Sequence, residues 1–346
     1  MMWMPGFKTV FVMGLAVLLT ACETPPPETS QWRHSESSYA AEISENGQYL
    51  LSASTKAAAR LWDITTNTMK YGWQNAAAEN TGSQAVAFAD NGEQAATVEY
   101  DTVLIWDVTS GEPLHRLTFP MRVKDVDLSP DGNHVILALA DRSAIYFDID
   151  ANQVRQRFVH DGSPINSEVN QPVNSVKISP DGKLALTGGD DFMARLWDIE
   201  TGEQVHSWRH KNRVNLVKFE SQGRFVVTAG DSDQTHLWAL PNGDLQASLR
   251  SSPWPAKWPL PDFPVFDYTT TAINFSEDGT LLVTGHSNER VCLWQLPTGQ
   301  KQRCWKVARQ HTLTPGIIIQ AISFTDNDNS VLAIGGDGIA QRWQWR

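Results

Sequence analysis

Residues 178–198 read Ile-Ser-Pro-Asp-Gly-Lys-Leu-Ala-Leu-Thr-Gly-Gly-Asp-Asp-Phe-Met-Ala-Arg-Leu-Trp-Asp, and this stretch decides the fold. It starts with an apolar residue, passes through a Ser-Pro-Asp-Gly turn and reaches an aromatic residue 19 positions later. The same pattern occurs seven times. The intervals run from Ile43 to Trp62, Phe88 to Trp106, Leu128 to Phe147, Ile178 to Trp197, Phe219 to Trp238, Phe275 to Trp294 and Phe324 to Trp343, all of 19 residues except the second, which has 18. A spacing held this closely indicates one structural unit repeated seven times.

Each unit is predicted to contain four short strands. A hairpin turn that ends in Gly joins the first two strands, except in the seventh unit, where the turn ends in Asp328. Short apolar runs follow, and a further large apolar residue stands 11 positions after each aromatic residue to mark a fourth strand. These residues are Trp73, Leu117, Phe158, Trp208, Leu249 and Trp305. Strands this short are not stable alone, so the units must bury their faces against one another in an all-β domain.

The seventh unit is predicted to borrow its fourth strand from the start of the chain. Only three residues follow Trp343, which leaves no room for such a strand. Residues 31–34, Gln-Trp-Arg-His, resemble residues 207–210, Ser-Trp-Arg-His, and Trp32 precedes Ile43 by 11 residues, as Trp208 precedes Phe219. Trp32 is therefore expected to complete the last unit. A ring closed in this way has no exposed sheet edge at the seam.

Residues 31–346 therefore resemble a seven-bladed WD-repeat β-propeller of four-stranded antiparallel blades. In that family a His, a Ser or Thr, an Asp and the Trp form a hydrogen-bonded set within a blade, and the resemblance implies such a set in the fourth unit, made by His160, Thr187, Asp191 and Trp197. The Trp-Asp dipeptide occurs at Trp62-Asp63, Trp106-Asp107 and Trp197-Asp198, and becomes Phe147-Asp148, Trp238-Ala239, Trp294-Gln295 and Trp343-Gln344 elsewhere.

Two other units carry partial sets. His34, Ser52 and Trp62 have Lys56 in place of the Asp, and His210, Thr228 and Trp238 have Ser232 there. Because these histidines occupy one repeated position, a structural role is favoured over a catalytic one. Residues 286–289, His-Ser-Asn-Glu, are interpreted as a polar tight turn.

The first thirty residues resemble the signal of a bacterial lipoprotein. Residues 1–21 contain one basic residue, Lys8, and an apolar run that is too short to span a membrane. Thr20 and Ala21 directly precede Cys22, as in a lipobox, so Cys22 is the expected lipidation site, although an ordinary signal peptide with an incidental Cys remains open. In such lipoproteins an Asp directly after the Cys is the signal for retention in the inner membrane, and this chain has Glu23 there, so the resemblance implies the outer membrane. Residues 22–30 then form a Pro-rich tether, and residues 31–346 the propeller.

The net charge limits the kinds of partner that the chain is expected to bind. The chain carries 28 basic and 39 acidic residues, a net charge of −11, which argues against nucleic acid and against an anionic membrane surface as binding partners. The lipid on Cys22 is therefore the expected contact with the membrane.

Cys292 and Cys304 remain besides Cys22, an even number that suits an oxidising compartment. If residues 297–299 form the loop between their strands, the two cysteines face each other on a hydrogen-bonded pair and form a disulfide. Two unpaired cysteines are the alternative.

Length variation points to one face. Insertions of 4, 9, 15 and 8 residues enter the second, fourth, sixth and seventh units, always between the fourth strand of one unit and the first strand of the next. In an up-and-down blade these joins share a face with the turns between the second and third strands. Insertions confined to one face of a repeat protein usually mark its binding side.

The longest insertion, residues 251–268, is the candidate partner-binding segment. Its aromatic residues are stiffened by proline, which lowers the cost of ordering them on binding. The segment either recognises a partner, folds down as a cap over the rim or channel, or is disordered. The candidate contact residues are Trp254, Trp258, Phe263, Phe266 and Tyr268.

Three functional hypotheses follow. The favoured one is a lipid-anchored module of the bacterial envelope, at the outer membrane and facing the periplasm, that binds a protein or peptide through the insertion-bearing face. It needs no cofactor or metal, and the sequence contains no nucleophile elbow, phosphate loop or paired-His zinc motif. The second hypothesis is a propeller enzyme or a receptor for a cation or sugar. It would use an acidic channel mouth formed by Glu99, Asp101, Asp141, Asp190, Asp231, Asp233 and Asp337. A purely structural envelope scaffold is the third.

Overall fold

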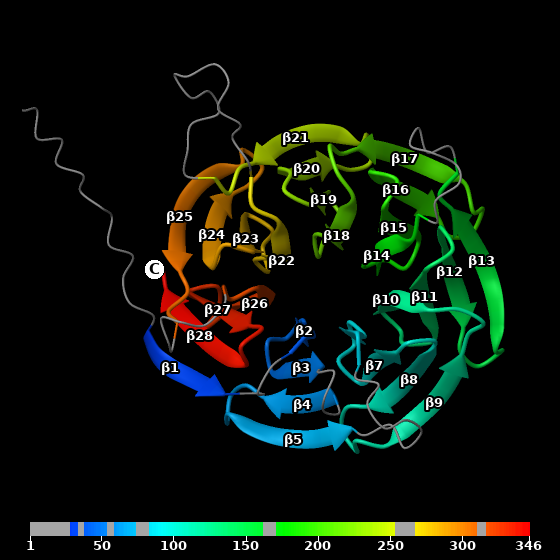
Figure 1. Ribbon diagram of the computed structural model, residues 1–346, viewed down its shortest axis with the longest axis horizontal. Coiled ribbons are helices and arrows are strands. Elements are labelled where there is room, and N and C mark those ends of the chain that lie inside the picture. Colours follow the sequence, from blue (N-terminus) through cyan, green and yellow to red (C-terminus); the bar gives the residue numbers. More distant parts are fainter. Residues whose placement is uncertain are drawn as a thin grey trace, which may run out of the picture.

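The structure is a computed structural model that describes residues 28–33, 38–53, 59–73, 83–161, 171–252, 267–309 and 316–346. Seven four-stranded antiparallel sheets are arranged as blades around a central channel (Figure 1). The predicted all-β, seven-bladed propeller is thus confirmed. Within the described ranges no helix is both long and apolar enough to cross a membrane.

Every blade is an up-and-down sheet whose strands follow one another from the channel to the rim. The first four blades contain β2 (Ala40–Ile43), β3 (Tyr49–Ala53), β4 (Ala59–Asp63) and β5 (Thr68–Trp73); β6 (Ala85–Phe88), β7 (Gln94–Glu99), β8 (Thr102–Asp107) and β9 (Pro113–Thr118); β10 (Val123–Leu128), β11 (His134–Leu139), β12 (Ser143–Asp148) and β13 (Gln153–Val159); and β14 (Val173–Ile178), β15 (Leu184–Gly189), β16 (Met193–Asp198) and β17 (Gln204–Arg209).

The remaining blades repeat this order, and the last one takes its outer strand from the start of the chain. They contain β18 (Val214–Phe219), β19 (Phe225–Gly230), β20 (Thr235–Ala239) and β21 (Asp244–Leu249); β22 (Thr270–Phe275), β23 (Leu281–His286), β24 (Arg290–Gln295) and β25 (Gln300–Lys306); and β26 (Ile319–Thr325), β27 (Ser330–Gly335), β28 (Ile339–Gln344) and β1 (Glu28–Arg33).

Strand β1 closes the ring as the sequence predicts. It pairs antiparallel with β28, and Figure 1 shows it on the outer edge of that strand. Trp32 lies opposite Ala340, three residues before Trp343, just as Trp208 lies opposite Ala194, three residues before Trp197. The strand begins at Glu28, so its first three residues fall within the segment that the sequence assigns to the tether.

The hydrophobic core is divided into seven layers, one between each pair of neighbouring blades. At the seam, Ile43 and Leu50 of the first blade pack with Leu332 and Ile334 of the last. Burying a side chain of this size stabilises a fold by about 1.5–3 kcal/mol relative to leaving it exposed. No blade can bury its two faces without both neighbours, so the ring is one cooperative domain.

The Ser-Pro-Asp-Gly turns owe their sequence to local hydrogen bonds. In the fourth blade the Ser179 hydroxyl donates to Asp181 Oδ1 at 2.7 Å and accepts from the Leu184 amide at 2.8 Å. Gly182 follows with φ of 72°, a left-handed conformation that glycine adopts without steric cost. In the seventh blade Asp328 takes the equivalent position with φ of 62°, a conformation that Asp tolerates better than most residues.

The joins between blades and the turns between second and third strands lie on one face, as predicted. The Ser38 amide, in the join that enters the first blade, donates to Gly336 O in such a turn at 3.1 Å, and Ser232 N donates to Thr269 Oγ1 at 3.0 Å. We call this side the insertion face and the opposite side, which carries the Ser-Pro-Asp-Gly turns, the turn face. The central parts of the four insertions lie outside the described residues.

Candidate functional site

The central channel opens into a cavity at each face. The cavity on the insertion face has a volume of about 560 Å³ and is lined by the beginnings of the first strands, among them Tyr39, Gln84 and Ile318. The cavity on the turn face has a volume of about 1060 Å³ and is lined by the turns between first and second strands. Glu42, Lys177 and Lys218 line both cavities, so they mark the wall that the two share.

Polar side chains of the first strands form this wall. Lys177 Nζ lies 2.7 Å from Asp127 Oδ1 and 3.4 Å from Glu42 Oε1. Burial lowers the pKa of Lys177, but the carboxylates of Asp127, Glu42 and Asp125 outweigh that effect and raise it, so the lysine keeps its charge. Sequence reasoning missed these residues. The sequence does mark them: in six of the seven units a polar residue stands directly before the apolar residue with which the 18- or 19-residue interval begins. These residues are Glu42, Asp127, Lys177, Lys218, Asn274 and Ser323.

Exposed large apolar side chains gather on the insertion face. Tyr39 is 64% exposed, Tyr100 53%, Ile318 50% and Tyr268 39%, and all four lie in joins or turns of this face. Tyr39 and Ile318 also line its cavity. In the described part of the chain the other exposed large apolar residues lie on the fourth strands at the rim, namely Met69, Leu114, Val154, Val159, Val205 and Leu245. The turns of the opposite face contribute none within the same ranges.

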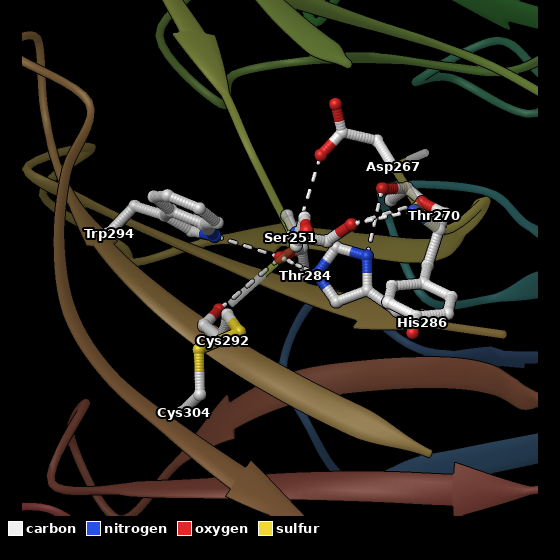
Figure 2. Close-up of a disulfide and its surroundings, with 10 residues drawn as sticks. Ser251, Asp267, Thr270, Thr284, His286, Cys292, Trp294 and Cys304 are labelled. Carbon is white, nitrogen blue, oxygen red and sulfur yellow. Dashed lines mark hydrogen bonds between the residues drawn. A yellow bond between two sulfur atoms is a disulfide. The ribbon is translucent and has the colours of Figure 1, made fainter. Parts of the chain in front are cut away.

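The base of the longest insertion is tied together where it leaves and re-enters the propeller. Ser251 Oγ donates to Tyr268 O at 3.2 Å and accepts from the Tyr268 amide at 3.0 Å. Next to it, the Ser252 amide donates to Asp267 Oδ1 at 3.3 Å, and Arg250 Nε lies 3.3 Å from Asp267 Oδ2. Figure 2 shows Ser251 and Asp267 beside the sixth blade. Three pairs of residues therefore hold the ends of the insertion at a fixed place on the insertion face.

Of the five predicted contact residues, only Tyr268 belongs to the described residues. Its side chain is exposed next to this base, where a partner can reach it. Trp254, Trp258, Phe263 and Phe266 lie outside the described residues, so their role stays a prediction.

Cys292 and Cys304 lie on neighbouring strands of the sixth blade and are joined by a disulfide, with Cα atoms 4.1 Å apart (Figure 2). Counting the strand register back from the turn predicts that these two cysteines face each other, but the pairing assumed at the turn itself is incorrect. Gln295, not Leu296, pairs with Gln300, and a bulge after Leu293 restores the register. A Cα separation of 4.1 Å is near that of a non-hydrogen-bonded pair of an antiparallel sheet, about 4.5 Å. The two cysteines therefore do not occupy the hydrogen-bonded pair that the sequence predicted.

The hydrogen-bonded set of the fourth blade is complete, as the resemblance implies. His160 Nδ1 lies 3.1 Å from Asp191 Oδ1, His160 Nε2 lies 2.7 Å from Thr187 Oγ1, and Trp197 Nε1 donates to the same hydroxyl at 2.9 Å. All four residues are buried. This arrangement ties the second and third strands of the blade, and the turn between them, to the segment that follows β13, so its polar groups are engaged with one another.

The fifth blade has an acid in its set, although the sequence predicted a partial set with Ser232 in place of the Asp. Asp233, not Ser232, pairs with His210, with 3.2 Å between His210 Nδ1 and Asp233 Oδ2. The reason is local backbone geometry. In the fourth blade Phe192, after the Asp, has φ of 67°, whereas in the fifth blade the left-handed residue is Ser232, with φ of 48°, and the Asp follows it.

Residues 286–289 form the predicted polar turn, in which the Glu289 amide donates to His286 O at 3.2 Å, and His286 itself is a buried structural residue. Its Nε2 lies 2.9 Å from Thr284 Oγ1, which also accepts from Trp294 Nε1 at 2.8 Å, and its Nδ1 lies 3.1 Å from Thr270 Oγ1. Figure 2 shows this chain of contacts. Burial lowers the pKa of His286 to about 3, so the imidazole is neutral in the folded protein.

The seven carboxylates of the acidic-mouth hypothesis do not converge on one cavity. Asp231 alone among them lines the insertion-face cavity. It accepts from Asn215 Nδ2 at 2.5 Å and lies 3.4 Å from Arg213. Asp141 pairs with Arg157, and Asp233 is buried against His210. These carboxylates mainly organise turns and ion pairs.

Comparison with known proteins agrees with this architecture. The family described as "WD domain, G-beta repeat" matches residues 162–198 and 266–295, which span parts of the fourth and sixth blades. The chain is a WD-repeat β-propeller. In this WD-repeat propeller the family model covers two repeats, while the spacing and the sheet topology identify the other five.

Several WD-repeat propeller relatives are distant in sequence. WD repeat-containing protein 1-A of Xenopus laevis is 23% identical over 58% of this chain and 33% of its own length. Cilia- and flagella-associated protein 52 of Sus scrofa is 27% identical over 42% of this chain and 23% of its own. Serine-threonine kinase receptor-associated protein of Homo sapiens is 21% identical over 49% of this chain and 45% of its own. The chain spans less than half the length of each relative.

Proposed function

We propose that this WD-repeat propeller is a protein-interaction module that presents its insertion face to a protein or peptide partner. The observation that carries the proposal is the placement of Tyr39, Tyr100, Tyr268 and Ile318 on that one face. Exposed aromatic and aliphatic side chains around a concave centre are the groups that dominate binding energy at protein interfaces. The similarity to a serine-threonine kinase receptor-associated protein, whose name describes an association, supports the same class of function.

The module is proposed to act in the bacterial envelope, held by a lipid on Cys22 at the outer membrane and facing the periplasm. The lipobox-like sequence before Cys22 motivates the proposal. The disulfide between Cys292 and Cys304 supports it, because such bonds persist in oxidising compartments. Cys22→Ser is expected to leave an unprocessed or soluble chain that does not incorporate labelled palmitate. Normal labelling of that variant contradicts the anchor.

The interaction is tested by removing apolar groups at the mouth of the insertion-face cavity. In the variant Tyr39→Ser/Ile318→Ser, partner affinity is expected to fall by about 30-fold or more, since truncating an interface anchor costs about 2 kcal/mol. The matched control is Val205→Ser/Leu245→Ser, which removes two exposed apolar residues from the rim. Capture from an envelope fraction and thermal melting are measured on both variants. Equal capture by both variants contradicts the insertion face as the binding side.

The role of the longest insertion needs a separate variant. If Trp254 and Trp258 contact the partner, Trp254→Ala/Trp258→Ala is expected to lose capture while the melting temperature stays nearly unchanged. If the insertion is a cap, the same variant loses stability and retains capture. Retained capture with lost stability refutes recognition by these residues, and the proposal then stands on the described face alone.

A further inference from the structure

The fifth blade contains a cluster of potential metal ligands outside the insertion-face cavity. His210, Asp233 and His236 each offer one ligand atom, and these atoms lie within 4.8 Å of one another. His210 and Asp233 are buried, and His236 on β20 is half-buried, so the cluster can be reached from the side of His236. The hydrogen-bonded set of the blade uses the first two residues and does not account for the third.

The fourth blade shows what the position of His236 can do. In that blade Arg195 stands opposite Thr187 in the sheet register, as His236 stands opposite Thr228 in the fifth. Arg195 Nη1 lies 2.5 Å from His160 Nδ1 and 2.5 Å from Asp191 Oδ2. A cation therefore occupies the space beside this His–Asp pair. In the fifth blade the side chain at that position is a shorter imidazole, which supplies a lone pair instead of a charge.

We propose that His210, Asp233 and His236 form a binding site for a divalent transition-metal ion such as Zn²⁺. Two tetrahedral ligands of Zn²⁺, each about 2.1 Å from the metal, are about 3.4 Å apart. His210 Nδ1 and Asp233 Oδ2 are 3.2 Å apart, so one ion fits between them. A rotation of His236 completes three protein ligands, and water takes the fourth position.

The hydrogen bonds around the cluster suit this role. His236 Nδ1 lies 2.9 Å from Ser248 Oγ, which leaves Nε2 as its ligand nitrogen. His210 Nε2 lies 2.8 Å from Thr228 Oγ1, which can accept the ring proton when Nδ1 binds the metal. A metal-ligating histidine almost always donates its other N–H in this way. Binding thus moves the ring proton from Nδ1 to Nε2 and requires no other reactant.

The charges of the cluster also suit a cation. Asp233 supplies a carboxylate beside the two imidazoles, and its position is fixed by the Lys211 amide, 2.9 Å from Oδ2, and by the Gln234 amide, 2.7 Å from Oδ1. The Lys211 ammonium lies 4.0 Å from Asp233 Oδ1, but its side chain is 81% exposed, so water screens its repulsion.

The test is titration of the purified full chain with Zn²⁺ by calorimetry, and with Co²⁺ by visible absorption. The chain is expected to bind one ion with a tetrahedral Co²⁺ spectrum. His236→Arg reproduces the fourth blade, so it is expected to keep the melting temperature and to lose at least about 100-fold in affinity. Ser248→Ala is expected to lose about 10- to 100-fold, because it removes the partner that orients His236.

The control variant is His115→Ala, which removes a partly exposed histidine of β9 and is expected to bind as the unmodified chain does. Absence of binding by the unmodified chain overturns the proposal. Binding by His236→Arg at the affinity of the unmodified chain also overturns it, as does loss of binding in His115→Ala. Should His236→Arg fold poorly, His236→Ala takes its place and the same outcomes decide.

Discussion

The hydroxyl of Thr187 provides a direct test of how the blades are stabilised. It lies 2.7 Å from His160 Nε2, accepts from Trp197 Nε1 at 2.9 Å and is fully buried. Thr187→Val keeps the shape of the side chain and removes both of these hydrogen bonds, together with the longer one, 3.4 Å, that the hydroxyl donates to Arg195 O. In the second blade Thr97 is also buried, but within the described residues its hydroxyl has one partner, Trp106 Nε1 at 2.9 Å. Thr97→Val is therefore the matched control.

The two changes differ in how many buried polar groups they leave without a partner. Each such group lowers the free energy of unfolding by about 1–3 kcal/mol. Thr187→Val is therefore expected to lower it by about 2–6 kcal/mol, and Thr97→Val by about 1–3 kcal/mol. With an unfolding entropy of about 2.1 cal/mol/K per residue, roughly 300 residues give about 0.6 kcal/mol/K. The melting temperature should therefore fall by about 3–10 °C for Thr187→Val and by about 2–5 °C for Thr97→Val.

The assay is thermal unfolding followed by calorimetry and by tryptophan fluorescence. Thr187→Ser retains the hydroxyl and removes one methyl group, so it should cost only about 1 kcal/mol. Equal shifts for Thr187→Val and Thr97→Val would refute the reasoning, because the second hydrogen bond would then contribute nothing. A larger loss in Thr187→Ser than in Thr187→Val would refute it as well, since packing and not hydrogen bonding would then control stability.

Three further predictions concern other parts of the propeller. Between about pH 3 and 6.5 His286 is protonated in the unfolded chain but not in the folded chain. The free energy of unfolding should therefore be about 2 kcal/mol lower at pH 5 than at pH 8 because of this residue. His286→Gln should flatten the pH dependence of the melting temperature, and His115→Gln should not. Deleting residues 28–33 should lower the melting temperature by several degrees, because β28 then loses its partner strand, and an unchanged midpoint would show that the ring does not close through β1. Cys292→Ser/Cys304→Ser should cost about 3 kcal/mol, since it frees a short loop in the unfolded chain, and two free thiols in the unmodified protein from an oxidising compartment would show that the disulfide does not form there.

The sequence predicted the features that every blade must share. The interval from Ile178 to Trp197 holds two strands and two short turns, so it varies by only one residue among the seven units, and it therefore reveals the blade number. The place of Trp32 could be predicted because residues 31–34 resemble residues 207–210 and because Trp32 precedes Ile43 by the same 11 residues that separate Trp208 from Phe219.

Features that depend on local backbone geometry were harder to predict. The bulge after Leu293, which has a counterpart at the same place in each of the first five blades, shifts the strand register by one position. The left-handed residue Ser232 moves the Asp of its turn by one position, and no residue type marks either change. The charged wall around Lys177 was missed because first-strand residues that face the channel look like ordinary polar residues of an alternating strand. The four exposed apolar residues of the insertion face come from separate blades, so only the folded ring shows that they share one side.

The direction of β1 has a consequence for how the propeller is oriented. Arg33 lies opposite Ile339, next to the insertion face, and Glu28 lies opposite Arg342, toward the turn face, so the chain enters β1 from the turn-face end. Five residues separate Cys22 from Glu28, a reach of about 15–18 Å for an extended segment. A lipid on Cys22 would therefore turn the Ser-Pro-Asp-Gly turns toward the membrane. The insertion face, with Tyr39 and Ile318, would then point away from the bilayer and be open to a partner.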